Sequence, residues 1–552
     1  MIKVSHLSVS FSPNTVVNNI SFTIHNNSIL GVVGESGSGK SITSLAILGL
    51  LPKAATVEGE ILFNDKNLLS LSEKEFQKLR GNDIAMIFQE PMSSLNPSLT
   101  CGFQVAEILK QHTNLSDTEI HEEVISLFKK VKLPRPEQIY SSYPHEISGG
   151  QKQRVMIAMA IACKPKLLIA DEPTTALDVT VQKEIIHLLK ELQLETKMSI
   201  LFITHDLGLV SEIANNVVVM YKGTIVEQGK AADVFLHPKE NYTKALINSK
   251  PHLNKRLKKL PTVSDFIHDT VESDLYTDED REAFHQKIYN QPPLLEIKNL
   301  KKEYISGGSW FSKKQIVKAV NDVSFSIHEG ETLGLVGESG CGKTTLGRTI
   351  LQLEKTTSGH IFYKGKDITK LNKSDLKSLR KEIQIIFQDP FSSLNPRIPV
   401  GKAILEPMKV HKILNSDKER KEYVLDLLKK VGLEPEHFYR YPHEFSGGQR
   451  QRIGIARTIA LQPKLIICDE SVSALDVSVQ AQVLNLLNQL KSEFNFTYIF
   501  ISHDLSVVKY MSDQLIVMNK GKIEELGDAD EIYQNPKTEY TQTLINAIPK
   551  GI

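Results

Sequence analysis

An internal duplication that runs the length of the chain constrains its fold more than any other feature. Three long motifs recur in the same order: GVVGESGSGKS, ending at Ser41, returns as GLVGESGCGKT, ending at Thr344; IFQEPMSSLNP (87–97) as IFQDPFSSLNP (386–396); and YPHEISGGQKQR (143–154) as YPHEFSGGQRQR (441–452). The two copies lie 298 to 303 residues apart, and the closing segments HPKENYTKALI and NPKTEYTQTLI also match. Each half of the chain is therefore one complete module.

The duplication divides the chain into three parts. We expect a first domain over residues 1–250, a polar linker over 251–292 and a second domain over 293–552. The linker carries a basic run at 255–259, an acidic run at 274–280 and prolines near both ends. Charge runs of this size usually form a solvated surface, and a docking site is the alternative. The role of the linker stays open.

Composition narrows the class of protein. Of 552 residues, 41% are hydrophobic and 24% are charged, which is typical of a soluble globular chain with a large core. Lys and Arg total 66 against 65 for Asp and Glu, so no net field draws the molecule to nucleic acid or an anionic bilayer. No run of 18 apolar residues and no signal-peptide pattern occurs, and the four cysteines form no CxxC pair. We therefore expect a reducing cytosol, with any membrane span supplied by partners.

Short apolar runs alternate with longer amphipathic stretches, which predicts an α/β core with a largely parallel sheet. LLIADE (167–172) and LIICDE (465–470) are expected to be buried strands that end in two carboxylates. ILFITH (200–205) and YIFISH (498–503) are expected to be the next strands, each ending in a histidine. Ligands bind at the carboxyl ends of such strands. The segments between each IFQ and SGG have a helical pattern and predict a helical subdomain.

The motif GxxxxGK(S/T) occurs at 34–41 and 337–344, after an apolar strand and before a helical pattern. Its glycines let backbone N–H groups face the phosphates of a nucleotide, and the helix N-terminus adds positive charge. The lysines, Lys40 and Lys343, would neutralise phosphate oxygens, and the hydroxyls that follow would ligate Mg²⁺. The motif occurs at the same place in both halves. Two glycine-rich turns that arose by chance would not explain this repetition.

A carboxylate pair ends the strand about 130 residues after each of these loops. Asp171 and Asp469 would bind the Mg²⁺ shell, which leaves Glu172 and Glu470 to face an attacking water. A lone Asp-Glu pair after a strand is more often a helix cap. Its repetition at the same distance in both halves favours the catalytic interpretation.

SGGQ at 148–151 and 446–449 precedes a long helical pattern, so it predicts a helix N-terminus whose backbone donors suit a phosphate. With this motif both halves resemble the ATP-binding cassette (ABC) ATPases, of which SGGQ is the signature. Other family motifs are matched by Gln89 and Gln388 (Q-loop), 175–178 and 473–476 (D-loop), and His205 and His503 (switch histidine). The resemblance implies that each module has a RecA-like α/β core, an antiparallel β subdomain and a helical subdomain.

The resemblance also implies a head-to-tail pair of ATP sites. Site one would combine Lys40, Gln89, Glu172 and His205 with Ser446 and Gly448, and site two Lys343, Gln388, Glu470 and His503 with Ser148 and Gly150. Both sites are expected to hydrolyse ATP. One departure is Ser471, where the first half has Pro173; it either loosens that turn and slows site two or, as we favour, is neutral. Phe11 and Tyr304 are placed to stack on adenine, with Trp310 and Phe311 as rivals in the second half and ordinary core or surface aromatics as the alternative.

The implied residue sets are as follows. The catalytic residues are Glu172, Glu470, His205, His503, Gln89 and Gln388. The Mg²⁺ ligands are Ser41, Gln89, Asp171, Thr344, Gln388 and Asp469. The ATP-binding residues are Gly34, Glu35, Ser36, Gly37, Ser38, Gly39, Lys40, Ser41, Gly337, Glu338, Ser339, Gly340, Cys341, Gly342, Lys343, Thr344, Thr345, Phe11, Tyr304, Ser148, Gly149, Gly150, Gln151, Ser446, Gly447, Gly448 and Gln449.

Several longer phrases resemble the ATPases of peptide and nickel importers: QEPMSSLNP, QDPFSSLNP, YPHEFSGGQRQR, ALDVSVQ, and the tails with Tyr242-Thr243 and Tyr540-Thr541. Both ATPases of such a system would be fused here, as in some glutathione and short-peptide importers. The resemblance implies a peripheral subunit on the cytoplasmic face of the membrane, under two permease subunits fed by an extracytoplasmic solute-binding protein. The surfaces around 89–97 and 388–396 would transmit motion to the permeases.

The solute stays open: di- and oligopeptides lead, followed by glutathione and then nickel or a metal chelate. The cysteine-bearing segment that many relatives carry after each module is missing, so no iron–sulfur cluster is expected. No nucleic-acid partner is expected either. An alternative of another class is a tandem ABC ATPase that acts on the ribosome, but such factors carry a long basic linker, whereas 251–292 is short and mixed in charge. DNA-repair ABC ATPases carry zinc-binding cysteines that this chain does not have.

Overall fold

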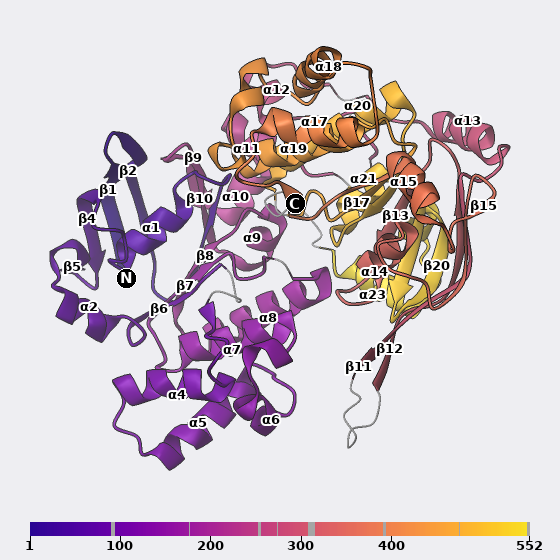
Figure 1. The fold of residues 1–552 in the computed structure, drawn as a ribbon. Coiled ribbons are helices and arrows are strands. Elements are labelled where there is room, and N and C mark those ends of the chain that lie inside the picture. Colours follow the sequence, from indigo (N-terminus) through magenta and orange to yellow (C-terminus); the bar gives the residue numbers. More distant parts are fainter. Residues whose placement is uncertain are drawn as a thin grey trace. The chain divides into compact units, whose positions relative to one another are not determined.

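The computed structural model describes residues 1–89, 94–175, 177–251, 255–272, 274–306, 315–389, 393–473 and 475–548. These residues form two compact units. One contains residues 1–247 and 263–270, and the other contains 248–262 and 271–548. The strands, and most of the helices, follow one another in the same order in both units (Figure 1). We call them module 1 and module 2.

The elements of module 1 run from the N-terminus to residue 267. The strands are β1 (Ile2–Phe11), β2 (Asn14–Ile24), β3 (Ile29–Val33), β4 (Ala55–Phe63), β5 (Lys66–Asn67), β6 (Ile84–Ile87), β7 (Leu167–Asp171), β8 (Ser199–Ile203), β9 (Asn216–Tyr221) and β10 (Thr224–Lys230). The helices are α1 (Lys40–Ile47), η1 (Leu68–Ser70), α2 (Glu73–Leu79), α4 (Cys101–His112), α5 (Asp117–Lys130), α6 (Pro136–Ser141), η2 (Pro144–Glu146), α7 (Gly149–Ile161), α8 (Val179–Thr196), α9 (Leu207–Ile213), α10 (Ala231–Leu236), α11 (Asn241–Asn248) and α12 (Val263–Ile267).

The elements of module 2 repeat this order after one additional helix, α13 (Asp278–Tyr289), but its described residues include no counterpart of η1 or α12. The strands are β11 (Leu295–Ser306), β12 (Gln315–Ile327), β13 (Thr332–Val336), β14 (Ser358–Tyr363), β15 (Lys366–Asp367), β16 (Ile383–Ile386), β17 (Leu465–Asp469), β18 (Thr497–Ile501), β19 (Gln514–Asn519) and β20 (Lys522–Asp528). The helices are α14 (Lys343–Ile350), α15 (Lys373–Glu382), α17 (Val400–Val410), α18 (Asp417–Lys430), η3 (Pro435–Tyr439), η4 (Pro442–Glu444), α19 (Gly447–Ile459), α20 (Val477–Phe494), α21 (Leu505–Met511), α22 (Ala529–Gln534) and α23 (Glu539–Asn546).

Each module contains two sheets. In module 1, the first sheet is antiparallel with the order β2-β1-β4-β5, and the second has the order β10-β9-β3-β8-β7-β6. All neighbours in the second sheet are parallel except β10 and β9. Module 2 has the same two sheets, β12-β11-β14-β15 and β16-β17-β18-β13-β19-β20. The predicted α/β fold with an added antiparallel subdomain is confirmed.

The parallel sheet separates two hydrophobic cores. Along β7, Leu168 and Ala170 join the core on the helical side, whereas Leu167 and Ile169 join the core under the antiparallel sheet. In β17 the corresponding residues divide between two cores in the same way. A strand that is buried on both faces needs apolar residues at every position, because successive side chains point to opposite faces. This requirement explains the continuous apolar runs in the sequence.

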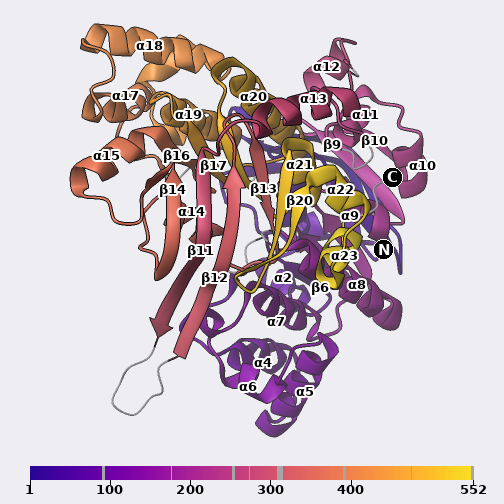
Figure 2. The same cartoon turned by 90° about the vertical axis from the view of Figure 1, so that its right-hand side faces the viewer.

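The predicted helical subdomain is formed by α4, α5 and α6 in module 1 and by α17, α18 and η3 in module 2 (Figures 1 and 2). In each subdomain, a glycine near the start of the first helix lets that helix pack closely against an aromatic ring. A Cβ atom at Gly102 would lie 2.3 Å from the ring of Tyr140, and one at Gly401 would lie 2.2 Å from the ring of Phe438. The arrangement therefore depends on a small residue at the start of α4 and of α17.

Residues 255–262 of the linker and its helix α13 pack on module 2, whereas α12, which lies between them in the chain, belongs to module 1. Arg256 donates a hydrogen bond to the carbonyl oxygen of Ser512 (2.6 Å), and Arg281 in α13 forms a salt bridge with Asp528 (3.1 Å). The backbone N–H of Leu260 donates to Asn485 Oδ1 (2.8 Å). These contacts hold residues 255–262 and α13 against the side of module 2 that carries α20 and α21.

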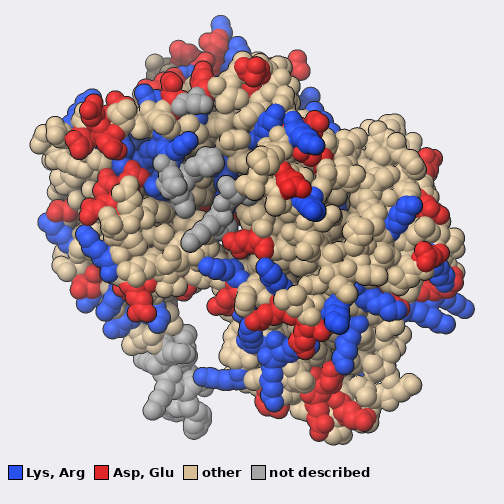
Figure 3. All heavy atoms as spheres, turned by 180° about the vertical axis from the view of Figure 1, so that it is seen from behind, with Lys and Arg blue, Asp and Glu red and all other residues tan. Residues whose placement is uncertain are grey.

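Charged residues of both signs are interspersed over the face seen in Figure 3, in keeping with the near-zero net charge of the chain. Among the residues that the structure describes, no helix is both long enough and apolar enough to span a bilayer.

Candidate ATP-binding and hydrolysis sites

The glycine-rich loop of each module joins a buried central strand to a helix. In module 1 it leads from β3 into α1, which begins at Lys40, and in module 2 from β13 into α14, which begins at Lys343. Gly34 opens the first loop with a φ of 150°, and a Cβ atom there would lie 2.2 Å from the carbonyl oxygen of Met220. The loop therefore lies directly against β9, where no other residue fits.

The loop lysines are buried, and each bonds to its own loop. Lys40 Nζ donates to the carbonyl oxygens of Gly34 (2.7 Å) and Glu35 (2.8 Å). Lys343 makes the corresponding bonds in module 2, at 2.5 and 3.0 Å. The two loops thus hold a cation at a helix N-terminus, which is the arrangement that binds phosphate.

The carboxylate pairs lie at the ends of β7 and β17, as the sequence predicts. Glu172 and Glu470 follow those strands with φ values of 47° and 48°, a left-handed conformation that turns the chain sharply. The backbone N–H of Glu172 donates to the carbonyl oxygen of Ile203 (2.8 Å), and that of Glu470 to Ile501 (2.9 Å). Each glutamate is therefore anchored to the end of the neighbouring strand.

Three predicted residues meet at the first glutamate. Gln89 Nε2 donates to Glu172 Oε2 (2.9 Å), and His205 Nδ1 lies 3.5 Å from Glu172 Oε1. Thr175 Oγ1 also donates to Oε2 (2.9 Å). Burial alone would raise the pKa of Glu172, but the hydrogen bond and positive charge of His205, with Thr175 and Lys40, lower it to about 2.

The second glutamate has the same neighbours. Gln388 Nε2 donates to Glu470 Oε2 (2.7 Å), and His503 Nδ1 lies 3.5 Å from that oxygen. Burial again acts to raise the pKa, and His503 with Lys343 more than offsets it, so the pKa of Glu470 is lowered. Both carboxylates are ionised at neutral pH.

The pKa values of the preceding aspartates are shifted in the opposite direction, upward. Burial raises the pKa of Asp171 to about 6, opposed by a hydrogen bond with Ser41, and it also raises the pKa of Asp469. Asp171 Oδ1 is buried without a hydrogen-bond partner among the described residues. Thr344 Oγ1 donates to Asp469 Oδ1 (3.1 Å).

These aspartates and hydroxyls are suited to Mg²⁺. The ion prefers oxygen ligands and is usually held by one or two carboxylates together with substrate phosphates. The buried, unpartnered oxygen of Asp171 beside the hydroxyl of Ser41 fits this requirement. No group of three or more His, Cys, Asp or Glu side chains that could hold a metal ion occurs in the described part of the chain.

Ser471 leaves the turn after Glu470 unchanged. The backbone N–H of Ser473 donates to Glu470 O at 3.2 Å, and in module 1, where Pro173 takes this position, the N–H of Thr175 donates to Glu172 O at the same distance. The two turns differ in a side chain instead, because Ser473 Oγ donates to the carbonyl of Glu470 (2.9 Å) rather than to its carboxylate.

The signature serines cap helices α7 and α19. The backbone N–H of Gln151 donates to Ser148 Oγ (3.3 Å), and Ser446 Oγ accepts the corresponding bond at 3.3 Å. Both serines are exposed. A Cβ atom at Gly150 would lie 2.9 Å from Val181, so a small residue is needed where the capped helix meets α8. Each signature therefore presents a helix N-terminus at the surface of its own module.

The aromatic candidates differ in their surroundings. Phe11 ends β1 and is partly buried against the core of its sheet. Tyr304 in β11 is 39% exposed, its hydroxyl bonds to Glu354, and Lys302 Nζ lies 4.8 Å from its ring centre. The rivals Trp310 and Phe311 lie outside the described residues.

One contact of the loops is absent from the sequence predictions. The backbone N–H of Glu35 donates to the hydroxyl of Tyr242 in α11 (3.1 Å), and that of Glu338 donates to Tyr540 in α23 (3.1 Å). The only signal in the sequence was that both tyrosines recur at the same place in the matching tails.

Comparison with known proteins agrees with this geometry. The model of the ABC transporter family matches residues 17–175 and 320–473, which include both glycine-rich loops and both carboxylate pairs. The chain belongs to the ABC transporter family. A second family model, the C-terminal region of oligopeptide and dipeptide transporters, matches this ABC ATPase at 226–271 and 525–551. Neither of these two ranges contains a cysteine.

The similar proteins include relatives that align with the whole length of this chain. The ABC ATPase is 45% identical to the glutathione import ATP-binding protein GsiA of Escherichia coli K12 over 566 aligned residues, which cover 100% of this chain and 89% of that protein. The corresponding protein of Pectobacterium atrosepticum is 44% identical with the same coverage. A solved dimeric ATP-binding cassette with ADP and phosphate is 29% identical, with a TM-score of 0.39, over 43% of this chain and 98% of its own.

Proposed function

We propose that this chain is the ATP-hydrolysing subunit of an importer for short peptides, glutathione among them, and that it works on the cytoplasmic face of the membrane. The observation that carries this proposal is the 45% identity with a glutathione import ATP-binding protein along the whole chain. The C-terminal region of peptide transporters, which is present after each module, supports it. Nickel or a metal chelate remains the second choice of solute.

We propose that each ATP site is composite, with the loop of one module facing the signature of the other. Lys40 and the amide groups of its loop bind the phosphates, and the exposed N-terminus of α19 at Ser446 closes the site. In the second site Lys343 and Ser148 take these parts. The loop hydroxyl, the aspartate and the Q-loop glutamine would hold Mg²⁺, which would neutralise phosphate charge.

Glu172 and Glu470 orient the attacking water in this mechanism. Their pKa values are lowered, so each carboxylate is a ready hydrogen-bond acceptor at neutral pH. In module 1 the switch histidine lies beside Oε1 of the carboxylate, and the glutamine amide donates to Oε2. In module 2 both groups lie at Oε2. Because phosphoryl transfer depends mainly on positioning and charge neutralisation, holding the carboxylate in place is one part of what the module contributes, beside the loop lysine.

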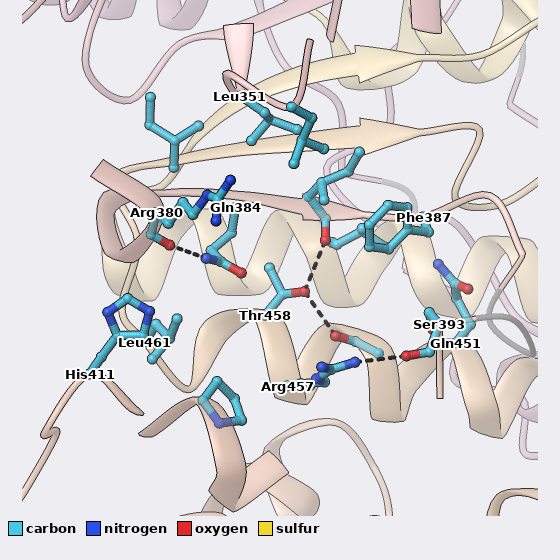
Figure 4. Close-up of a pocket in the computed structure, with 16 residues that line it drawn as sticks. Leu351, Arg380, Gln384, Phe387, Ser393, His411, Gln451, Arg457, Thr458 and Leu461 are labelled. Carbon is cyan, nitrogen blue, oxygen red and sulfur yellow. Dashed lines mark hydrogen bonds between the residues drawn. The ribbon is translucent and has the colours of Figure 1, made fainter. Parts of the chain in front are cut away.

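A groove beside each Q-loop supplies a surface for a permease. In module 2 it lies between β16 and α19 and is lined by Gln384, Phe387, Arg457 and Thr458, among others (Figure 4). Gln451 is 2% exposed, lines the groove, and its Nε2 has no hydrogen-bond partner among the described residues. A segment that enters this groove therefore meets a hydrogen-bond donor.

The groove of module 1 is more apolar. Met159 and Ala160 line it at the positions of Arg457 and Thr458, and Met156 lies one turn before them. We propose that module 1 receives an apolar helix of one permease subunit and that module 2 receives a segment with acceptor groups from a different subunit. Flexible methionines suit the first role, and a guanidinium suits the second.

Affinity purification of the tagged chain from detergent-solubilised membranes, followed by mass spectrometry, tests this function. Recovery of two permease subunits together with a solute-binding protein that carries peptide would support the proposal. Recovery of ribosomes in place of permeases would contradict it and would favour the translation-factor class, although both kinds of protein hydrolyse ATP.

A further inference from the structure

The glycine-rich loop of each module is held by a tyrosine from the C-terminal segment of that module. In module 1 the backbone N–H of Glu35 donates to the hydroxyl of Tyr242 (3.1 Å). The carbonyl of Gly34, which belongs to the same peptide group, accepts from Lys40 Nζ (2.7 Å). One peptide group is therefore bound at both of its polar ends, by the lysine and by the tyrosine.

Module 2 repeats this contact independently. The N–H of Glu338 donates to Tyr540 (3.1 Å), and the carbonyl of Gly337 accepts from Lys343 Nζ (2.5 Å). The two halves differ at many surrounding positions; for example, Tyr221, whose ring lies 4.2 Å from that of Tyr242, is replaced by Asn519. The preserved hydroxyl contact is thus not a by-product of identical packing.

The helix that carries the tyrosine is itself fixed to the sheet. In module 1, Glu227 of β10 accepts from the backbone N–H of Lys239 (2.9 Å) and of Glu240 (3.2 Å), just before α11. In module 2, Glu525 of β20 accepts from Lys537 (3.1 Å) in the same way. Carboxylates bind helix N-termini well, so these bonds set the position of each helix.

We propose that Tyr242 and Tyr540 are positioning residues for ATP binding, through which the C-terminal segment holds the first peptide of the loop in its phosphate-binding shape. When ATP binds, the lysine must give up carbonyl contacts to reach a phosphate. The tyrosine hydroxyl contacts the opposite side of the peptide group and stays in place. Without the hydroxyl, the peptide group would lose its contact with the tyrosine as well as its contact with the lysine when ATP binds. This inference deepens the proposed function, since it requires ATP to bind at both loops.

The test is steady-state ATP hydrolysis and equilibrium ATP binding by the full chain carrying Tyr242→Phe and Tyr540→Phe together. These substitutions remove only the hydroxyls, and the phenyl rings preserve the packing. We expect KM for ATP and Kd to rise about three- to tenfold, the effect of one neutral hydrogen bond, while kcat changes by less than twofold. A purely structural role would lower the melting temperature and the active fraction without changing KM.

The matched control is Tyr221→Phe, which removes the hydroxyl from the ring beside Tyr242 and should leave KM unchanged. Each single variant, Tyr242→Phe or Tyr540→Phe, should weaken binding at one of two sites and give biphasic binding. A KM for the double variant within twofold of the unmodified chain would overturn the inference. Failure of the unmodified chain to bind ATP would instead contradict the proposed function, and the inference with it.

Discussion

Gln89 and Glu172 lie 83 residues apart in the chain, and their side chains share a 2.9 Å hydrogen bond from Nε2 to Oε2. Gln388 and Glu470 share the same bond at 2.7 Å. The Q-loop leads into the groove that we assign to a permease, and the glutamate faces the reacting phosphate in our proposal. The bond therefore joins the transport surface to the hydrolytic residue in a single contact within each module.

Replacing both glutamates by glutamine should preserve ATP binding and reduce turnover at least 100-fold, because the amide is a poor acceptor for the proton of the attacking water. Each single variant should slow hydrolysis while binding remains, and the double variant should trap a closed, ATP-bound state. Single-turnover assays with labelled ATP, together with gel filtration of the nucleotide-bound chain, measure both effects. Hydrolysis by Glu172→Gln/Glu470→Gln at the unmodified rate would refute the assigned role.

Lys40→Ala and Lys343→Ala should weaken ATP binding itself, by about tenfold or more at the altered site, because the loop loses its only lysine ammonium beside the phosphates. Titration calorimetry with ATP under non-hydrolysing conditions gives the affinity of each site. Lys53→Ala, at an exposed position beyond α1, serves as the control. Tight binding by both loop variants would show that the loops do not hold the nucleotide.

Ser471→Pro should leave the turnover of site two within twofold, since the turns after Glu470 and Glu172 already share their backbone hydrogen bond. The reciprocal change, Pro173→Ser, should also be neutral in module 1. To isolate each site, the assay uses a chain in which the other catalytic glutamate is replaced by glutamine. If the turnover of site two in the Ser471→Pro variant rose fivefold or more, the serine would be shown to slow that site.

The stability of module 2 should fall as the pH rises from about 4.5 to about 7, because of Glu331. This side chain is fully buried, and burial raises its pKa from 4.5 to about 7. In that interval the unfolded chain has released the proton that the folded chain keeps, so the free energy of unfolding decreases, by up to about 3 kcal/mol.

Denaturant unfolding of the full chain at several pH values measures this dependence. Glu331→Gln should remove this contribution, whereas the exposed control Glu436→Gln should keep it. Module 1 has Ser28 at the corresponding position, so the part of the dependence above about pH 6, beyond the raised pKa of Asp171, should be confined to the unfolding of module 2. Equal pH profiles for the unmodified chain and Glu331→Gln would contradict the prediction.

Much of the fold follows from the sequence because its main signals are local. Continuous apolar runs at 167–171 and 465–469 became the buried strands β7 and β17, and the glycine-rich loops lie between a strand and a helix as expected. The grouping of Gln89, Glu172 and His205 was implied by the resemblance to ABC ATPases. The structure brings the three together because they stand at the ends of neighbouring strands.

Other contacts depend on packing between distant segments, which periodicity does not reveal. Nothing local to Tyr242 indicates that its hydroxyl reaches the amide of Glu35, 207 residues away. The packing of the partly buried Arg256 against the end of α21 is likewise set by where the linker folds back. Only a contact map, or the recurrence of the same residue in both halves, could have pointed to such partners.

Uptake of labelled glutathione and short peptides by cells tests the central claim most directly. A strain without this chain would receive either the unmodified chain or Glu172→Gln/Glu470→Gln at equal abundance. We predict that the unmodified chain restores energy-dependent uptake of at least one of these solutes and that the variant does not. Equal uptake with the variant, or no restored uptake of peptides or glutathione by the unmodified chain, would contradict the assignment of this chain as the ATPase of a peptide importer.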